Sequence, residues 1–300
     1  MDPAYLALTG QESCLAALRH VVQSGGFGHA LLFASYDDVA TDAVASWCTA
    51  RIVCTAKLSD PCGSCAGCTS VKRQDGLMLL QTTLGERPTY AVDDIRAIRS
   101  HLALRAGQSG RRVVRIDNVD RCTVAAANAL LKILEEPSMD VTFILTTASS
   151  ARVLPTIRSR AMLYRLQPVP RTTMERSLAA SGVPTSIIST VIAVAPGQLG
   201  TAAALVASPD ALASAQSADA TAEKLVAQTT TGRFRTLATY LEGKQEAGVQ
   251  RQQVRSLFAA FARRAATDQW VQQRLGRLLT GLIDLQSNSQ PRLLLEAFVT

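Results

Sequence analysis

The first half of the chain alternates short apolar runs with helical patterns, and this alternation limits its fold more than any other feature. Up to about Leu166, four runs of strand length are separated by longer segments of helical periodicity. Because neighbouring parallel strands need a crossover connection, usually a helix, the pattern predicts a parallel sheet with helices on both faces. The predicted strands are ALLFAS at 30–35, LMLLQT at 77–82, RVVRID at 112–117 and VTFILTT at 141–147.

Two segments between these strands carry clear helical signals. VDDIRAIRSHLAL at 92–104 places its apolar residues close to one helical face. TVAAANALLKILEE at 123–136 starts with Thr123, a suitable cap, and Pro137 follows it. Arg115 is unusual because it stands in the middle of a predicted buried strand. A salt bridge is the only explanation that the sequence suggests for it.

Strand signals stop after LQPVP at 166–170, and the rest of the chain reads as helical. Three short helical patterns predict a small helical unit, and three longer ones with a final PRLLLEAFV predict an all-helical domain. Between them, from Ser208 to about Thr231, lies a stretch of low complexity. It is predicted to be a helical connector; a disordered linker is the alternative, which its apolar residues disfavour. The predicted domains are 1–166, 167–208 and 209–300.

Composition excludes some classes of protein. Because no run approaches about eighteen apolar residues, and MDPAYLALTGQESC lacks the features of an export signal, we expect a soluble cytoplasmic protein without a membrane partner. The net charge of +7 permits an acidic partner such as nucleic acid. Between Arg233 and Arg292, Lys and Arg residues outnumber Asp and Glu residues. These positive charges fit either solvent-exposed helix faces or an acidic partner.

Four cysteines have the spacing of metal ligands: Cys54, Cys62, Cys65 and Cys68. Two consecutive C-x-x-C steps and an upstream cysteine can converge on one tetrahedral ion, and four thiolates favour zinc. Because such a site has no open position for water, the zinc would be structural. An iron–sulfur cluster and a C-x-x-C thiol oxidoreductase are the alternatives, and a cytoplasmic location disfavours disulfides.

HALLFASYDDVATDAVA at 29–45 has the frame of a phosphate-binding loop but not its residues. In the pattern G-x-x-x-x-G-K-T, Ser35 and Ala40 replace the glycines, Thr41 the lysine and Asp42 the hydroxyl residue. Asp38 and its neighbours add negative charge, and each unit pair at 4 Å repels by about 1 kcal/mol even in water. We therefore expect no ATP at this loop. The alternative is an unrelated turn whose aspartates cap a helix.

Two further motifs connect this loop to a family. ANALLKILEEP at 127–137 and TIRSR at 156–160 resemble the signatures of the clamp-loader branch of the AAA+ proteins. The opening TGQESCLAALRHVV, the four-cysteine module and SNSQPRLLLEAF at 287–298 also fit that family. The resemblance implies an α/β AAA+ domain at 1–166, with a zinc module at 54–68. A helical lid domain at 167–208 and an all-α collar domain for oligomerisation at 209–300 would follow.

The same resemblance assigns roles to single residues. In the family, the arginine of a Ser-Arg-Cys motif reaches ATP held by a neighbouring subunit, which makes Arg160, with Ser159 beside it, an arginine finger in trans. Ala161 replaces the motif's cysteine, and Asn118 replaces the glutamate that orients the attacking water. Thr201 stands where ATPase members carry a nucleotide-sensing arginine. The alternative for Arg160 is a plain ion pair with an acidic side chain.

The family implies a non-catalytic subunit of the DNA polymerase III complex. It would occupy a hetero-pentameric ring with gamma/tau-type ATPase subunits and a delta subunit. The ring would load a sliding clamp on primed DNA, contacted indirectly or through phosphates. Two rivals remain open: an ATP-hydrolysing motor subunit, and a stand-alone zinc-containing DNA-binding protein.

Overall fold

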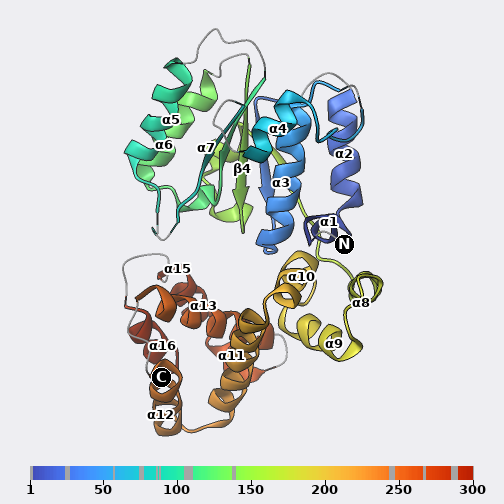
Figure 1. The fold of residues 1–300 in the computed structure, drawn as a ribbon. Helices are drawn as coiled ribbons and strands as arrows, with labels where there is room; N and C mark the ends of the chain where they lie inside the picture. The colour runs from blue at the N-terminus through green and yellow to red at the C-terminus, as the bar shows by residue number, and fades with distance from the viewer. Residues whose placement is uncertain are drawn as a thin grey trace. The chain divides into compact units, whose positions relative to one another are not determined.

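A computed structural model describes most of the chain, and Figure 1 shows its course. The described residues are 3–23, 28–56, 58–73, 78–85, 87, 89–104, 111–136, 140–242, 247–265, 268–284 and 290–299. They form two compact units, Met1–Ala204 and Leu205–Thr300. The finer division into three domains stays a prediction.

The first unit is built on a five-stranded parallel sheet in the order β2-β3-β4-β1-β5. Its strands are β1 (Ala30–Ala34), β2 (Leu79–Thr82), β3 (Arg112–Ile116), β4 (Val141–Thr147) and β5 (Met162–Arg165). The first four confirm the predicted strands, with ends that differ by one or two residues. The edge strand β5 was not predicted. Its four residues are exposed or half-buried, so it lacks the apolar run that marks a central strand.

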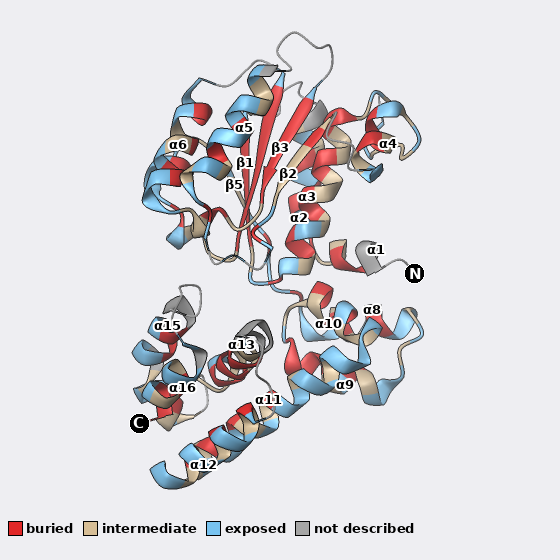
Figure 2. Ribbon diagram, turned by 60° about the vertical axis from the view of Figure 1, so that its left-hand side comes forward, coloured by how far each residue is buried: buried red, intermediate tan, exposed pale blue. Residues whose placement is uncertain are grey.

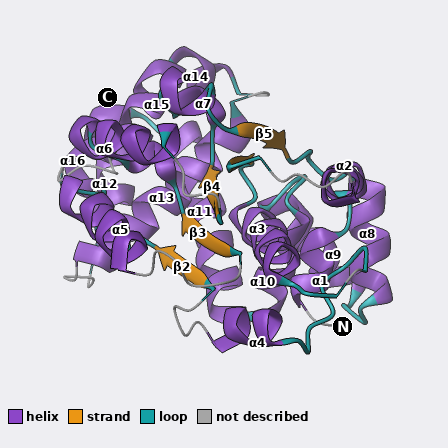
Figure 3. Cartoon of the chain, turned by 90° about the horizontal axis from the view of Figure 1, so that it is seen from above, coloured by secondary structure: helices purple, strands orange, loops and turns teal. Residues whose placement is uncertain are grey.

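Helices cover both faces of this sheet (Figure 3). Leu31 and Phe33 of β1 pack with Val44 on one face, while Leu32 packs with Leu130 on the other, as the two-residue period of a strand requires. Figure 2 shows the central strands buried along their length. The helices of this unit are α1 (Pro3–Leu8), α2 (Glu12–Gln23), α3 (Asp38–Val53), α4 (Ala66–Arg73), α5 (Val92–Leu104), α6 (Val124–Glu135), α7 (Pro155–Arg158), α8 (Arg171–Ala180), α9 (Thr185–Val194) and α10 (Leu199–Ala207).

The predicted helix at 123–136 corresponds to α6, and its cap is the predicted one. The Thr123 hydroxyl accepts a hydrogen bond from the N–H of Ala126 at 3.2 Å. Pro137, expected just beyond the helix, lies outside the described residues. The helix ends at Glu135, which places an acidic side chain at the negative end of the helix dipole.

The second unit is helical throughout its described residues. It contains α11 (Pro209–Ala227), α12 (Thr230–Leu241), α13 (Ala247–Arg264), α14 (Gln269–Gln273), α15 (Leu275–Asp284) and α16 (Pro291–Val299). The low-complexity stretch is therefore largely a helix, α11. Aromatic side chains fill the core, where the rings of Phe261 and Phe298 lie 4.6 Å apart. In the described residues, no helix has the length and apolarity needed to span a membrane.

Candidate functional site

Several backbone N–H groups of the loop after β1 are already bonded within the protein, so they are not free to bind a phosphate. Helix α3 starts at Asp38, with Asp37 as its N-cap. The N–H of Ala40 donates to the Asp37 carboxylate at 3.1 Å, and that of Thr41 to the Asp37 carbonyl at 2.9 Å. The N–H of Ser35 donates to the Thr147 carbonyl at 3.1 Å. These N–H groups donate within the protein, so the segment after β1 forms a capped helix start, unlike a phosphate-binding loop, whose N–H groups point at the ligand.

Arg115 connects β3 to α3, the helix that follows this loop. Its side chain lies on the α3 face of the sheet with 4% of its area exposed. The guanidinium donates to Asp42 of α3 at 2.5 Å, to Ser46 of α3 at 2.9 Å and to Asp117 of its own strand end at 2.8 Å. The salt bridge that the sequence suggested is thus present, and it joins two carboxylates to one buried cation.

Asp117, which the resemblance to AAA+ ATPases marks as a possible magnesium ligand, has several partners. Besides Arg115, it accepts hydrogen bonds from the Gln81 side chain at 2.9 Å and from the Thr146 hydroxyl at 3.2 Å. Asn118, at the catalytic-glutamate position, adopts a left-handed backbone with φ of 54°, which asparagine tolerates well. Its N–H donates to the Thr146 hydroxyl at 3.0 Å. The carboxyl ends of β2, β3 and β4 therefore form a closed polar network.

Arg160 lies in the turn after α7, two residues beyond Arg158. Its guanidinium pairs with Glu135 at the end of α6 at 2.7 Å and donates to the Thr156 carbonyl at 3.1 Å. The Ser159 hydroxyl donates to the same carbonyl at 3.0 Å. About a third of the Arg160 side chain is exposed, at 36%. The ion pair expected under the alternative interpretation of Arg160 is present, and it supplies Glu135 with a partner that the sequence did not identify.

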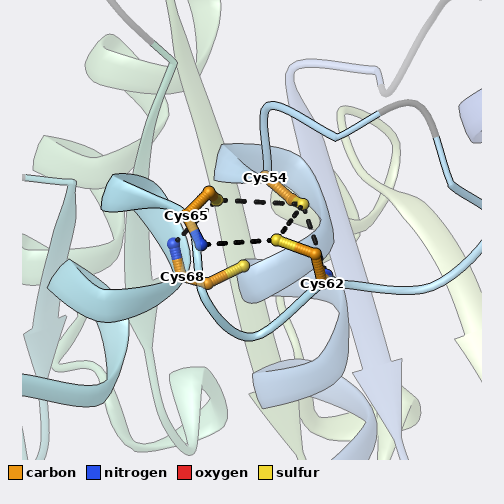
Figure 4. A group of neighbouring side chains, drawn as sticks. All are labelled: Cys54, Cys62, Cys65 and Cys68. Carbon is orange, nitrogen blue, oxygen red and sulfur yellow. Dashed lines mark hydrogen bonds between the residues drawn. The ribbon is translucent and has the colours of Figure 1, made fainter.

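The four predicted metal ligands come together (Figure 4). Cys54 follows the end of α3, Cys62 and Cys65 lie in the next turn, and Cys68 is in α4. Their sulfur atoms all lie within 4.8 Å of one another. The Sγ of Cys54 is 3.6 Å from that of Cys62 and 3.9 Å from that of Cys65. A tetrahedral zinc with Zn–S bonds of about 2.3 Å needs sulfur separations of roughly 3.8 Å, so this donor set fits zinc.

The backbone around the cysteines favours thiolates. The N–H of Cys68 points at the Sγ of Cys65 at 3.5 Å and is the largest cause that lowers the pKa of Cys65 to about 5. The backbone N–H of Ser64 is the largest cause that lowers the pKa of Cys62. Burial raises the pKa of Cys68 to about 12, so ionisation of that thiol needs a nearby cation.

Glycine lets the cysteine turn pack against α3. A Cβ on Gly67 would lie 2.2 Å from the carbonyl oxygen of Val53, closer than atoms can approach. Because Gly67 stands between Cys65 and Cys68, any larger residue would push two of the four thiols away from Cys54. Glycine at position 67 is thus a requirement of the packing.

Comparison with solved structures shows which fold this chain shares. The chain resembles a DNA polymerase III gamma-subunit-related protein from Thermotoga maritima with a TM-score of 0.55 and 18% identity. The match covers 95% of this chain and 97% of that one. At this identity the likeness shows that the two chains share a fold.

Sequence relatives narrow the class. The chain is 35% identical over 152 residues to the DNA polymerase III delta' subunit of Escherichia coli K12, covering 49% of this chain and 45% of that protein. It is 34% identical over 142 residues to the delta' subunit of Haemophilus influenzae, covering 47% and 43%. It is 32% identical over 177 residues to the gamma/tau subunit of Mycobacterium tuberculosis H37Rv, covering 59% and 31%. The chain thus spans less than half the length of these relatives.

A family model described as DNA polymerase III, delta subunit matches residues 10–170. The chain belongs to this family of clamp-loader subunits, and within it to the delta-prime type.

Proposed function

We propose that this chain is a non-catalytic subunit of a cytoplasmic DNA polymerase III clamp loader. In this proposal it binds no ATP, supplies Arg160 to the ATP of a neighbouring gamma/tau-type subunit, and helps to load a sliding clamp on primed DNA. Family membership supports the clamp-loader assignment. The observation that carries the non-catalytic role is the set of hydrogen bonds from buried Arg115 to Asp42 and Asp117.

That contact opposes the binding of a magnesium nucleotide in two ways. A divalent cation at Asp117 would need the carboxylate that Arg115 already holds, and it would meet the positive guanidinium at short range. Displacing Arg115 would leave a charge unpaired at a position where its side chain is 4% exposed. Breaking a buried pair in this way costs about 3–5 kcal/mol. The binding free energy of a nucleotide would therefore be reduced by this cost of displacing Arg115.

The surroundings of Arg160 suit a group that changes partners. Arg160 and Glu135 have 36% and 48% of their side chains exposed. Such an ion pair contributes about 0–1 kcal/mol to stability, so the guanidinium can leave Glu135 at little cost. A phosphate oxygen offers the planar guanidinium a second acceptor of higher charge. In this proposal Arg160 pairs with Glu135 of α6 in the free subunit, and binds the nucleotide of a neighbouring subunit in the assembled ring.

The remaining parts of the chain complete the proposal. Cys54, Cys62, Cys65 and Cys68 would hold one structural zinc, which closes the segment between α3 and α4. Helices from 167 to 208 would form the lid domain, and those from 209 to 300 the collar that joins the ring of gamma/tau-type and delta subunits. Buried aromatic packing gives the second unit a core of its own, which supports an assembly role.

Reconstitution of the full complex tests the role of Arg160. Arg160→Ala should lower DNA-stimulated ATP hydrolysis by the partner subunits by about 10³-fold or more at the affected site, as loss of an arginine finger does. Assembly, measured by size-exclusion chromatography, should not change. Arg176→Ala on α8 is the matched control, because it removes an exposed arginine elsewhere in the first unit. Unchanged hydrolysis with Arg160→Ala in an assembled complex would refute the role.

A further inference from the structure

The side chain of Asp37 is buried between the first turns of two helices. It is 5% exposed, although it carries a carboxylate. One oxygen accepts hydrogen bonds from the N–H of Ala40 at 3.1 Å, the N–H of Thr201 at 3.1 Å and the hydroxyl of Thr201 at 3.0 Å. The other oxygen accepts from the N–H of Gly200 at 2.9 Å. Asp37 therefore caps α3 and, at the same time, the start of α10, which lies more than 160 residues along the chain.

The fit between these two helices leaves no room for another group. A Cβ on Gly200 would lie 2.7 Å from the nitrogen of Ala40 and 2.9 Å from the Oδ1 of Asp37. Glycine is thus the residue that allows α10 to approach the start of α3. The contact is direct, and the Asp37 carboxylate accepts the hydrogen bonds of all the donors named here.

This set of donors has the character of an anion site. Backbone N–H groups at helix starts, together with a hydroxyl, bind phosphate and sulfate because both the hydrogen bonds and the helix dipoles favour negative charge. Here the donors from α3 and α10 converge on a carboxylate of the chain itself. Asp37 lies in the loop between β1 and α3, and the corresponding strand–loop–helix segment of nucleotide-binding proteins binds a phosphate.

We propose that the Asp37 carboxylate is a built-in substitute for a bound phosphate group and fastens α10 to the start of α3. The inference goes beyond the proposed function and does not depend on Arg160. It means that the contact between these helices, which a nucleotide could otherwise bridge, is permanent in this chain. Removal of the carboxylate should convert the position into a site for a free inorganic anion.

Hydrogen exchange on the full chain, read at single amides, tests this proposal. In Asp37→Ala, the amides of Gly200 and Thr201 should exchange about tenfold faster or more, because each loses a charged acceptor. Inorganic phosphate or sulfate should restore their protection in a saturable manner, whereas chloride at equal ionic strength should not. The same anions should leave these amides unchanged in the wild type. Amides of α9 are an internal control for general stabilisation by salt.

Asp37→Asn is the matched variant, because it keeps the volume and an acceptor oxygen but loses the charge. Its Gly200 and Thr201 amides should exchange at an intermediate rate, and phosphate should not protect them because the side chain still occupies the position. If Asp37→Ala does not fold in the absence of anions, Asp37→Asn decides the fastening role, and failure of phosphate or sulfate to restore the fold of Asp37→Ala would overturn the anion substitution. Wild-type exchange at both amides in Asp37→Asn or Asp37→Ala would overturn the fastening role. Faster exchange in Asp37→Ala that neither phosphate nor sulfate reverses would overturn the anion substitution.

Discussion

Arg115 on β3 donates to Asp42 on α3 across 2.5 Å, from a side chain that is 4% exposed. The guanidinium also holds Asp117, so one cation of the chain pairs with two carboxylates, one on α3 and one just after β3. Asp37 is satisfied by N–H groups and a hydroxyl. The aspartates of this loop therefore do more than repel phosphate. Asp37 and Asp42 both take part in contacts within the protein.

The Arg115 contacts predict a large loss of stability when the cation is removed. Arg115→Met keeps most of the apolar stem but leaves Asp117 without its charged partner. The free energy of opening of β3, measured by hydrogen exchange, should fall by roughly 3 kcal/mol. Asp42→Asn should cost less, because 63% of the Asp42 side chain is exposed. Equal or greater protection in Arg115→Met would show that the ion pairs do not hold this part of the sheet.

The pair of Arg160 and Glu135 predicts a weak coupling. A double-mutant cycle with Arg160→Ala and Glu135→Ala should give an interaction energy below about 1 kcal/mol, because both side chains are substantially exposed. Thermal denaturation of the four proteins provides the measurement. A coupling well above that value would mean that Arg160 is fixed on α6, and its transfer to a neighbour's nucleotide would then be costly.

The cysteine geometry predicts stoichiometric zinc in protein purified under reducing conditions. Cys65→Ser should lose the metal, since it removes a sulfur whose neighbouring N–H groups favour the thiolate. Gly67→Ala should weaken zinc retention because its Cβ would meet the Val53 carbonyl. Gly276→Ala in α15 is the control, since nothing lies within 4 Å of that Cβ. Metal analysis that finds no zinc in the wild type would exclude the metal site.

Asp94 predicts a pH dependence of stability. The hydrogen bond from Arg87 is the largest cause that lowers the pKa of the Asp94 carboxyl, and the N–H of Ala91 lowers it further. Because the folded-state pKa lies below the unfolded value of about 3.9, the stabilisation is present above that pH and is lost as the pH falls through the folded value.

Asp94→Asn should therefore reduce stability by less than about 1 kcal/mol at neutral pH, because it loses the charge that pairs with Arg87, whose side chain is 53% exposed. The difference between the two proteins should shrink below about pH 4. Denaturation at a series of pH values provides the test. A difference that stayed constant down to pH 2 would mean that the charge of Asp94 contributes nothing.

Features set by neighbouring residues could be predicted from the sequence. The cysteines converge because their spacing is short, and Thr123 caps α6 through a residue three positions away. Apolar runs buried on both faces of the sheet marked β1 and β4 clearly. The edge strand β5 escaped prediction because its residues are exposed or half-buried.

Features that depend on distant residues could not be predicted. Arg115 and Asp42 are 73 positions apart, and Asp37 and Gly200 are 163 apart. Nothing in the loop after β1 indicates that its carboxylates are bound from β3 and from α10. The partner of Glu135 was equally hidden, because Arg160 reaches it from a turn beyond the next strand. In each case a charged residue occupies an unusual position in the sequence, and the tertiary fold supplies its partner.

Binding of ATP by the isolated full chain tests most directly whether its own side chains have replaced the nucleotide. Equilibrium dialysis with radiolabelled ATP and magnesium would compare this chain with a gamma/tau-type subunit at the same concentration. The filled space around Arg115 and Asp37 predicts no saturable binding to this chain and saturable binding to the gamma/tau-type subunit. Stoichiometric, magnesium-dependent binding of ATP to this chain would contradict the non-catalytic role.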